Sequence, residues 1–202
     1  TWTLKDLTGQ TTGYYFDIVQ IGAGGNGGYL VQRLSKMLHA FLDIKHFKYT
    51  IADGDFVEEK NLLRQPFIAE DMNMSKAKIL SDRYSSAYDI PLYYNDQYIE
   101  STDNIAKLFV GGAYRMTYVP ILIGCVDNNA TRKIMHTFFE EVCHNMIYLD
   151  SGIDSVTGDT PADREESGYS GQVVLGIKKE GKVILDPVGG VYPNILEEDD
   201  SN

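Results

Sequence analysis

A cluster of glycines lies early in the chain, between an apolar stretch and an amphipathic one. The cluster, GAGGNGG at 22–28, follows residues 16–21, which read as a short strand, and precedes apolar residues at helical spacing between 30 and 42. Such glycines let the backbone approach a phosphate, and the start of the helix offers unpaired N–H groups and the positive end of its dipole. Asp53 ends the next predicted strand, 47–52, where its carboxylate can accept hydrogen bonds from ribose hydroxyls. The pattern predicts nucleotide binding.

A compact set of hydrogen-bond donors follows Asp53 and indicates a triphosphate rather than a dinucleotide. Asn61, Arg64 and Gln65 lie within one short segment, and the charge on β- and γ-phosphates calls for such amide and cationic groups. Lys76, at the start of the next predicted helix, adds an ammonium group. Each residue alone has an ordinary interpretation, because a surface arginine often forms a salt bridge and a helical lysine is usually solvated. Their order along the chain favours a triphosphate ligand.

An acidic residue, Asp127, follows the almost continuously apolar stretch 120–126, which predicts a central strand. Ligands of open α/β sheets bind at the carboxyl ends of the strands, so a carboxylate there is placed to hold Mg²⁺ directly or through water. The alternative is that Asp127 caps the following helix. Arg132, within that helix, is interpreted as an ion-pairing residue rather than a catalytic one.

These residues need a frame of strands and helices to position them, and the remaining pattern supplies it. Helices are predicted over 75–88, 101–110 and 131–143, and further strands over 92–99 and 146–149. The dipeptide Glu180-Gly181 between two apolar stretches predicts an antiparallel hairpin. We therefore expect an α/β fold, Rossmann-like and doubly wound, with a mostly parallel sheet and a C-terminal antiparallel hairpin.

The chain has 202 residues, enough for one domain with a complete hydrophobic core. No internal repeat and no clear linker divides it. We expect a single domain over 1–202, made of a nucleotide-binding core at about 14–150, a polar loop at 154–170, the hairpin at about 172–186 and an acidic tail at 196–202.

The composition excludes several classes of partner. The net charge is −11, from 29 acidic and 18 basic residues, which argues against a general nucleic-acid binder and against attachment to anionic lipid. No apolar stretch approaches the roughly 20 residues that span a bilayer. The two cysteines, Cys125 and Cys143, are interpreted as reduced core thiols of a cytoplasmic protein. We expect no nucleic-acid partner and no membrane partner.

Taken together, four motifs resemble the ThiF/MoeB/HesA family, the adenylation domains related to ubiquitin-activating enzymes. They are GxGGxG at 22–27, DxD-x(5)-N-L-x-R-Q at 53–65, S-K-A at 75–77 and C-x-D-N-x-A-T-R at 125–132. The likeness extends over about 16–150, and it is nearest to short ThiF-like proteins encoded in bacterial mobile and plasmid-borne gene clusters.

The resemblance implies a reaction in which the C-terminal carboxylate of a ubiquitin-like β-grasp protein, usually ending in glycine, is joined to AMP with release of pyrophosphate. It implies ATP and Mg²⁺, and a homodimer. The residues that it assigns to the nucleotide are Gly22, Gly24, Gly25, Gly27, Asp53, Asp55, Asn61, Arg64, Gln65, Lys76 and Asn128, and those that it assigns to catalysis are Arg64, Lys76 and Asp127, with Asp127 as the metal ligand. Asp55 has a second interpretation, as a residue that faces away from the nucleotide and orders the loop.

The sequence departs from the family pattern in three respects. It has no paired C-x-x-C motifs, so we expect no structural zinc in this chain. The polar segment 154–170 contains no cysteine that would accept a thioester, and Cys125 resembles a structural cysteine of the family. The first arginine is Arg33, within the first predicted helix, so an N-terminal arginine reaching the ATP site is missing or is supplied in another way.

Three other functions remain open at this point. The chain fits a catalytically silent scaffold that binds nucleotide within a multi-protein complex, or an enzyme that adenylates a small carboxylate. An NAD-dependent dehydrogenase fits less well, because Asn61, Arg64 and Lys76 would then have no role.

Overall fold

The computed structural model describes residues 13–41, 46–111, 116–153 and 170–197, together with Thr3, Lys5, Thr8 and Thr160. Apart from Thr160 and Ser170, the predicted polar loop at 154–170 lies outside the described residues, as does the predicted acidic tail beyond Glu197. None of the described helices has the length and apolar character needed to cross a bilayer.

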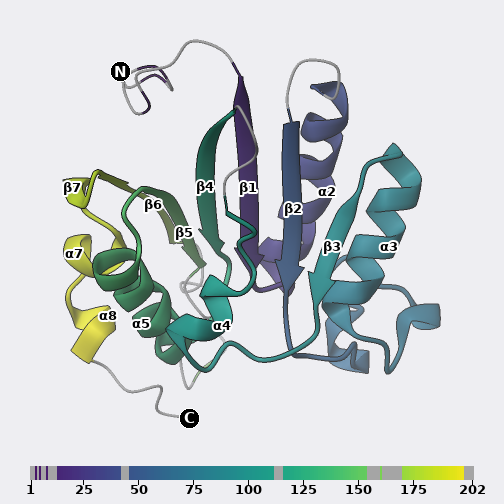
Figure 1. Ribbon diagram of the computed structural model, residues 1–202. Helices are drawn as coiled ribbons and strands as arrows, with labels where there is room; N and C mark the ends of the chain where they lie inside the picture. Colours follow the sequence, from purple (N-terminus) through teal and green to yellow (C-terminus); the bar gives the residue numbers. More distant parts are fainter. Residues whose placement is uncertain are drawn as a thin grey trace.

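One sheet of seven strands, in the order β3-β2-β1-β4-β5-β6-β7, runs through the molecule (Figure 1). Its strands are β1 (Tyr14–Ile21), β2 (His46–Ala52), β3 (Leu92–Asn95), β4 (Thr117–Gly124), β5 (Met146–Ile153), β6 (Gly171–Lys179) and β7 (Lys182–Leu185). The first five strands are parallel, whereas β6 runs antiparallel to both β5 and β7. The predicted fold class is therefore confirmed: the sheet is doubly wound and mostly parallel, and it ends in an antiparallel hairpin.

Helical segments connect the strands and cover the two faces of the sheet. The longer ones are α2 (Gly25–Ala40), α3 (Lys76–Tyr88) and α5 (Asn129–Thr137), and the shorter ones are η1 (Glu59–Asn61), η2 (Ala69–Asp71), α4 (Thr102–Ala106), η3 (Phe138–Val142), α7 (Val188–Val191) and α8 (Asn194–Glu197). The side chain of Ser75 accepts a hydrogen bond from the Lys78 N–H, so the predicted N-cap of α3 is confirmed.

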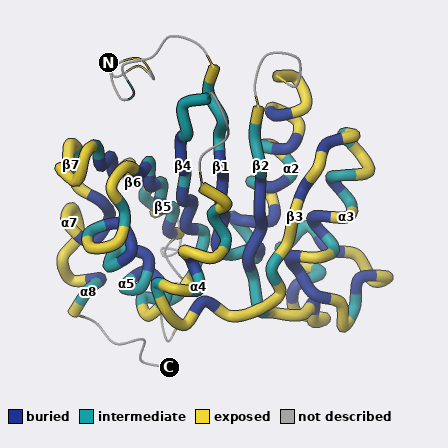
Figure 2. The backbone as a smooth tube through the Cα atoms, viewed as in Figure 1, coloured by how far each residue is buried: buried dark blue, intermediate teal, exposed yellow. Residues whose placement is uncertain are grey.

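Two apolar clusters form the core, one on each face of the sheet. One cluster holds Ile18 of β1 against α2 and α3, and the other holds Val19 and Ile21 of β1 against α4, α5, η3, α7 and α8. Side chains of a strand point alternately to its two faces, so β1 contributes to both clusters. Burial is concentrated in β1, β2 and β4, while β3 and β7 at the edges are mostly exposed (Figure 2).

Several element boundaries differ from the sequence prediction. The predicted strand 92–99 ends at Asn95, and the predicted helix 131–143 begins at Asn129 and passes into the π-helical turn η3. The ammonium group of Lys178 donates to the carbonyl oxygens of Phe139 and Glu140 and so stabilises this widened turn from a distant strand. Strand β5 continues beyond Asp150 to Ile153 because β6 pairs with its full length. Leu196 and Glu197, expected in the tail, belong to α8.

Candidate nucleotide site

The glycine loop connects β1 to α2 at the carboxyl edge of the sheet, where the strand order reverses between β1 and β4. Gly22 has a φ of +96°, and a Cβ atom there would lie 2.4 Å from the carbonyl oxygen of Cys125. At Gly27 a Cβ atom would lie 2.1 Å from the carbonyl oxygen of Gly22. These two positions require glycine because the backbone segments are in close contact.

Two other glycines of the loop face open space. A Cβ atom on Gly25 would meet no atom within 4 Å, and one on Gly24 would meet only the Gln65 amide, at 3.7 Å or more. Gly24 is the N-cap of α2, so no side chain caps the first N–H groups of this 16-residue helix. Uncapped N–H groups and the positive end of the dipole together form a suitable site for an anion.

Asp53 joins the glycine loop to the segment after β2. Its Oδ2 accepts a hydrogen bond from the Ala23 N–H at 2.6 Å, and its Oδ1 accepts one from the Asp55 N–H at 2.8 Å. Burial raises the pKa of Asp53, and the hydrogen bonds from Asp55 and Ala23 offset only part of that rise. Each carboxylate oxygen retains a further lone pair, so the predicted contact with ribose hydroxyls remains chemically possible.

Lys76 and Asp55 form an ion pair beside this carboxylate. The Lys76 ammonium lies 2.8 Å from Oδ2 of Asp55, and the hydroxyl of Tyr98 donates to Oδ1 of Asp55 at 2.9 Å. Burial acts to raise the pKa of Asp55, but the hydrogen bonds from Lys76 and Tyr98 outweigh it and hold the pKa below its usual value. The lysine side chain is 7% exposed, so this geometry fits the second interpretation of Asp55, as a residue that orders the loop. Tyr98 belongs to this site, but no sequence motif indicated it.

The segment from η1 to η2 lies over the glycine loop and carries the predicted amide and cationic residues. Asn61 is buried, and its Oδ1 accepts from the Glu58 N–H at 2.8 Å. Arg64 is exposed and forms no salt bridge within the described part of the chain. The Oε1 atom of Gln65 is buried without a hydrogen-bond partner. The Gln65 atom nearest the glycine loop is Nε2, which would lie 3.7 Å from a Cβ atom on Gly24. This NH₂ group is a donor, and a phosphate oxygen can accept a hydrogen bond from it.

At the end of β4, Asp127 is exposed, and Asn128 caps α5 by accepting from the Thr131 N–H at 2.8 Å. Arg132 donates from Nε to Oδ1 of Asp150 at 3.3 Å and also to the Val126 carbonyl oxygen, so its predicted role as an ion-pairing residue is confirmed. The described residues contain no group of three or more possible metal ligands. A single exposed carboxylate nevertheless fits Mg²⁺, which is commonly held by one or two carboxylates together with substrate phosphates and water.

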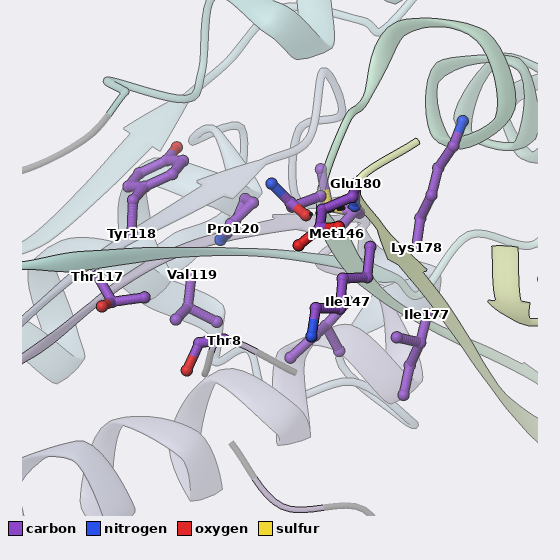
Figure 3. A pocket seen from close by; sticks show the side chains of 12 residues that line it. Thr8, Thr117, Tyr118, Val119, Pro120, Met146, Ile147, Ile177, Lys178 and Glu180 are labelled. Carbon is purple, nitrogen blue, oxygen red and sulfur yellow. Dashed lines mark hydrogen bonds between the residues drawn. The ribbon is translucent and has the colours of Figure 1, made fainter. Parts of the chain in front are cut away.

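A separate hollow of about 170 Å³ lies at the opposite ends of the central strands from the glycine loop (Figure 3). Its walls come from the first residues of β4 and β5 and the last residues of β6, including Thr117, Met146 and Ile177. These are the amino ends of the parallel strands, whereas the glycine loop, Asp53 and Asp127 follow carboxyl ends. None of the predicted site residues lines this hollow.

No protein-family model and no curated protein matches the chain. Among solved structures it is similar to Escherichia coli tRNA N6-threonylcarbamoyladenosine dehydratase, TcdA, with a TM-score of 0.50 and 15% identity over 74% of this chain and 62% of that one. It is also similar to E. coli MccB, with a TM-score of 0.50 and 20% identity over 67% of this chain and 35% of that one. The chain shares the ThiF/MoeB-type fold of these two proteins.

The resemblance deduced from the motifs is thus confirmed at the level of the fold. The matched region spans about three fifths of TcdA and about a third of MccB, so both proteins contain parts that the matched region lacks. Within this ThiF-type fold the structure brings the glycine loop, Asp53 and Gln65 together and places Asp127 at the neighbouring strand end.

Two further residues of the site were missed in the sequence. Gln20, fully buried at the end of β1, contacts the glycine loop from beneath, and Arg83 of α3 binds the segment that carries Gln65. The only signal for Gln20 was a polar residue within an apolar strand, two positions before the glycine cluster.

Proposed function

We propose that this protein is an ATP- and Mg²⁺-dependent adenylyltransferase that activates the C-terminal carboxylate of a ubiquitin-like β-grasp protein, giving an acyl-adenylate and pyrophosphate. The observation that carries the proposal is the open glycine loop at an uncapped helix N-terminus, with the NH₂ group of Gln65 beside Gly24. The fold supports the same conclusion because the similar structures are adenylating enzymes.

The chemistry needs positioning more than reactive side chains. A carboxylate oxygen of the substrate attacks the α-phosphorus in line, a new O–P bond forms, and the bond from the α-phosphorus to the bridging oxygen breaks as pyrophosphate leaves. The N–H groups of Gly24 and Gly25 are placed to bind the α-phosphate, Asp53 the ribose, and Arg64 the β- and γ-phosphates. Mg²⁺, when bound, would neutralise phosphate charge, and Asp127 is the residue that would hold it, with Asn128 next to it.

A protein substrate is supported by an apolar strip on the sheet. Ile153 of β5 and Val173 and Leu175 of β6 are 61%, 75% and 41% exposed, and the strand register places them on one face. The end of β5 lies beside the carboxyl end of β4, since Gly124 pairs with Asp150. A β-grasp domain seated on this strip would therefore have its C-terminal tail close to the nucleotide.

The direct test is ATP–pyrophosphate exchange in the presence of candidate β-grasp proteins that end in glycine. We expect exchange that depends on both the partner and Mg²⁺, and about a hundredfold loss on Arg64→Ala or Asp127→Ala. Arg33→Ala and Asp82→Ala, which alter exposed residues elsewhere, are the matched controls and should exchange normally. Exchange that stayed absent with wild-type protein and its partner would overturn the proposal.

A silent nucleotide-binding scaffold is a second candidate, and one contact favours it. Lys76, the residue expected to contact phosphate, is bonded to Asp55. A scaffold would bind ATP, measured by calorimetry, without any exchange, whereas an enzyme would show both. Asp55→Asn provides a further distinction, because freeing the ammonium should strengthen ATP binding in either case but increase exchange only in an enzyme.

We further propose that the protein is a homodimer, on the basis of the resemblance. We also propose that it is cytoplasmic, because its two cysteines are free thiols. Sedimentation equilibrium of the isolated chain, with and without ATP, measures the assembly state. A single species at the monomer mass of 22.7 kDa across micromolar concentrations would contradict the dimer.

A further inference from the structure

A buried polar contact lies directly beneath the glycine loop. Nε2 of Gln20 donates to the carbonyl oxygen of Gly22 at 2.8 Å and to that of Gly27 at 3.0 Å, so both amide hydrogens are used. Oε1 of the same amide accepts a hydrogen bond of 2.5 Å from the hydroxyl of Tyr49 on β2. Gln20 and Tyr49 are both 0% exposed, so water does not compete for these groups.

The two carbonyl groups held by Gln20 are the two ends of the loop. Gly22 is the first residue after β1, and Gly27 lies in the first turn of α2. Between them lie Gly24 and Gly25, where an added Cβ atom would meet open space or only the Gln65 amide, and the Ala23 N–H is held by Asp53. The loop cannot widen or move away from the sheet without breaking one of the bonds to Gln20.

Tyr49 holds the other end of this amide. The carbonyl oxygens of Gly22 and Gly27 can only accept, so the NH₂ group of Gln20 must face them and Oε1 faces the Tyr49 hydroxyl, which donates to it. Gly22 has no backbone donor to its carbonyl oxygen within the described residues. An apolar side chain at this position would fill the same volume but leave that carbonyl without a donor.

We propose that Gln20, held in place by Tyr49, is a positioning residue that holds the glycine loop in the shape that binds the nucleotide phosphates. The inference rests on the proposed nucleotide site and adds to it a residue that does not touch the ligand. Holding a loop of N–H groups in place before a ligand arrives lowers the cost of binding, so phosphate affinity depends on the amide as well as on fold stability.

The test compares ligands with and without phosphates on Gln20→Met, a substitution of similar volume that cannot donate. Calorimetry at a temperature well below unfolding would measure ATP, AMP and adenosine on the full chain. We expect affinity for ATP and AMP to fall about tenfold or more, while adenosine, held through Asp53, binds as it does to wild type. Tyr49→Phe removes only the hydroxyl and should show the same selective loss to a smaller extent.

The control is Leu122→Ala, a fully buried change in β4 whose side chain belongs to the cluster on the other face of the sheet. It lowers stability without reaching the loop, and the ratio of ATP to adenosine affinity should stay at the wild-type value. An unchanged ratio in both Gln20→Met and Tyr49→Phe, or a parallel loss of all three ligands, would overturn the inference. Wild-type protein that bound none of them would overturn the proposed nucleotide site itself.

Discussion

Two glycines in one short loop have opposite surroundings, and alanine at each should separate stability from binding. At Gly25 the added methyl group meets open space at the start of a helix. We therefore expect the free energy of unfolding to stay the same or to rise by up to about 1 kcal/mol. ATP binding should weaken, because the methyl group occupies the space of the ligand. At Gly22 the positive φ and the 2.4 Å approach to Cys125 should cost about 2–5 kcal/mol. Urea unfolding and ATP titration measure the two effects, and a Gly25→Ala variant that binds ATP normally would contradict the site.

The two cysteines should not accept an acyl group from the adenylate. Burial raises the pKa of Cys125 to about 11 and that of Cys143 to about 12, and the reactive form of a thiol is the thiolate. At pH 8 about one thiol in a thousand is ionised for Cys125 and fewer for Cys143, and each unit of pH up to these values raises that fraction about tenfold.

Reaction of the native protein with a disulfide reagent from pH 7 to 10 measures this behaviour. We expect slow labelling that accelerates with pH, and no adduct with the partner that dithiothreitol cleaves. A partner adduct that is lost in Cys125→Ser would contradict the assignment of Cys125 as structural.

Sequence reasoning identifies residues whose location in the fold follows from their position directly after a strand or near the glycine loop. Asp53 follows a strand and therefore reaches the carboxyl edge, and Gln65 lies close to the glycines once that strand is placed. Gln20, Tyr98 and Arg83 were not foreseen, because their roles depend on contacts between distant segments. Arg83, for example, meets the carbonyl oxygen of Pro66, 17 positions away, and no spacing rule for a helix identifies that pairing.

At the scale of the elements, the segment that carries Arg64 and Gln65 is fixed by α3 and α2. Arg83 donates to the Pro66 carbonyl oxygen at 2.7 Å and to both carboxylate oxygens of Asp71 at 2.7 and 2.5 Å. A Cβ atom on Gly28 of α2 would lie 2.6 Å from the Pro66 ring. Pro66 is therefore held between two helices, and the residues before it are directed over the glycine loop.

Removing this anchor should loosen the segment. Arg83→Ala leaves the carboxylate of Asp71, which is 7% exposed, without its cation, and we expect a loss of about 2–4 kcal/mol in the free energy of unfolding. The double variant Arg83→Met, Asp71→Asn removes both charges and should recover part of that loss. Urea unfolding measures both variants; equal stability of the single and double variants would contradict a coupled pair.

The boundaries of the elements show where sequence patterns stop being informative. The spacing of apolar residues, together with capping and turn residues, predicted β1, α2, α3 and the β6–β7 hairpin. The turn of this hairpin holds Glu180 and Gly181 at φ values of +51° and +75°. The π-helical turn after α5 was not foreseen, because its stabilisation comes from Lys178, about 40 residues later in the chain. Tertiary contacts of this kind override local propensity at the ends of elements.

At the scale of the whole molecule, the topology explains why the described helices leave the apolar strip exposed. Parallel strands are joined by crossover helices that cover a face of the sheet, and α2 and α3 cover only the part formed by β1 and its neighbours. Strands β6 and β7 extend the sheet as a hairpin, and among the described residues none from these two strands belongs to the apolar cluster that α2 and α3 form on the strip's side of the sheet. The strip of Ile153, Val173 and Leu175 is therefore a consequence of this architecture, and contiguous exposed apolar residues commonly mark a binding surface.

A charge placed on this strip should separate partner recognition from nucleotide chemistry. We expect Val173→Lys and Leu175→Lys to leave ATP affinity and unfolding unchanged, because both side chains are substantially exposed and neither is among the residues assigned to the nucleotide. Partner-dependent pyrophosphate exchange should fall at least about tenfold, through a higher KM for the β-grasp protein, since a buried unpaired lysine weakens an apolar interface.

The matched control is Val183→Lys, the same substitution on β7. Val183 pairs with Lys178, and the Lys178 side chain lies on the face opposite to the strip, so Val183 lies on that opposite face as well. This control should keep the wild-type KM. If all three variants raised the KM equally, general charge would explain the effect, and if none did, the partner would dock elsewhere. A selective loss in Val173→Lys and Leu175→Lys would place the partner on the face that brings its tail to the carboxyl edge, where in-line attack on the α-phosphorus needs it.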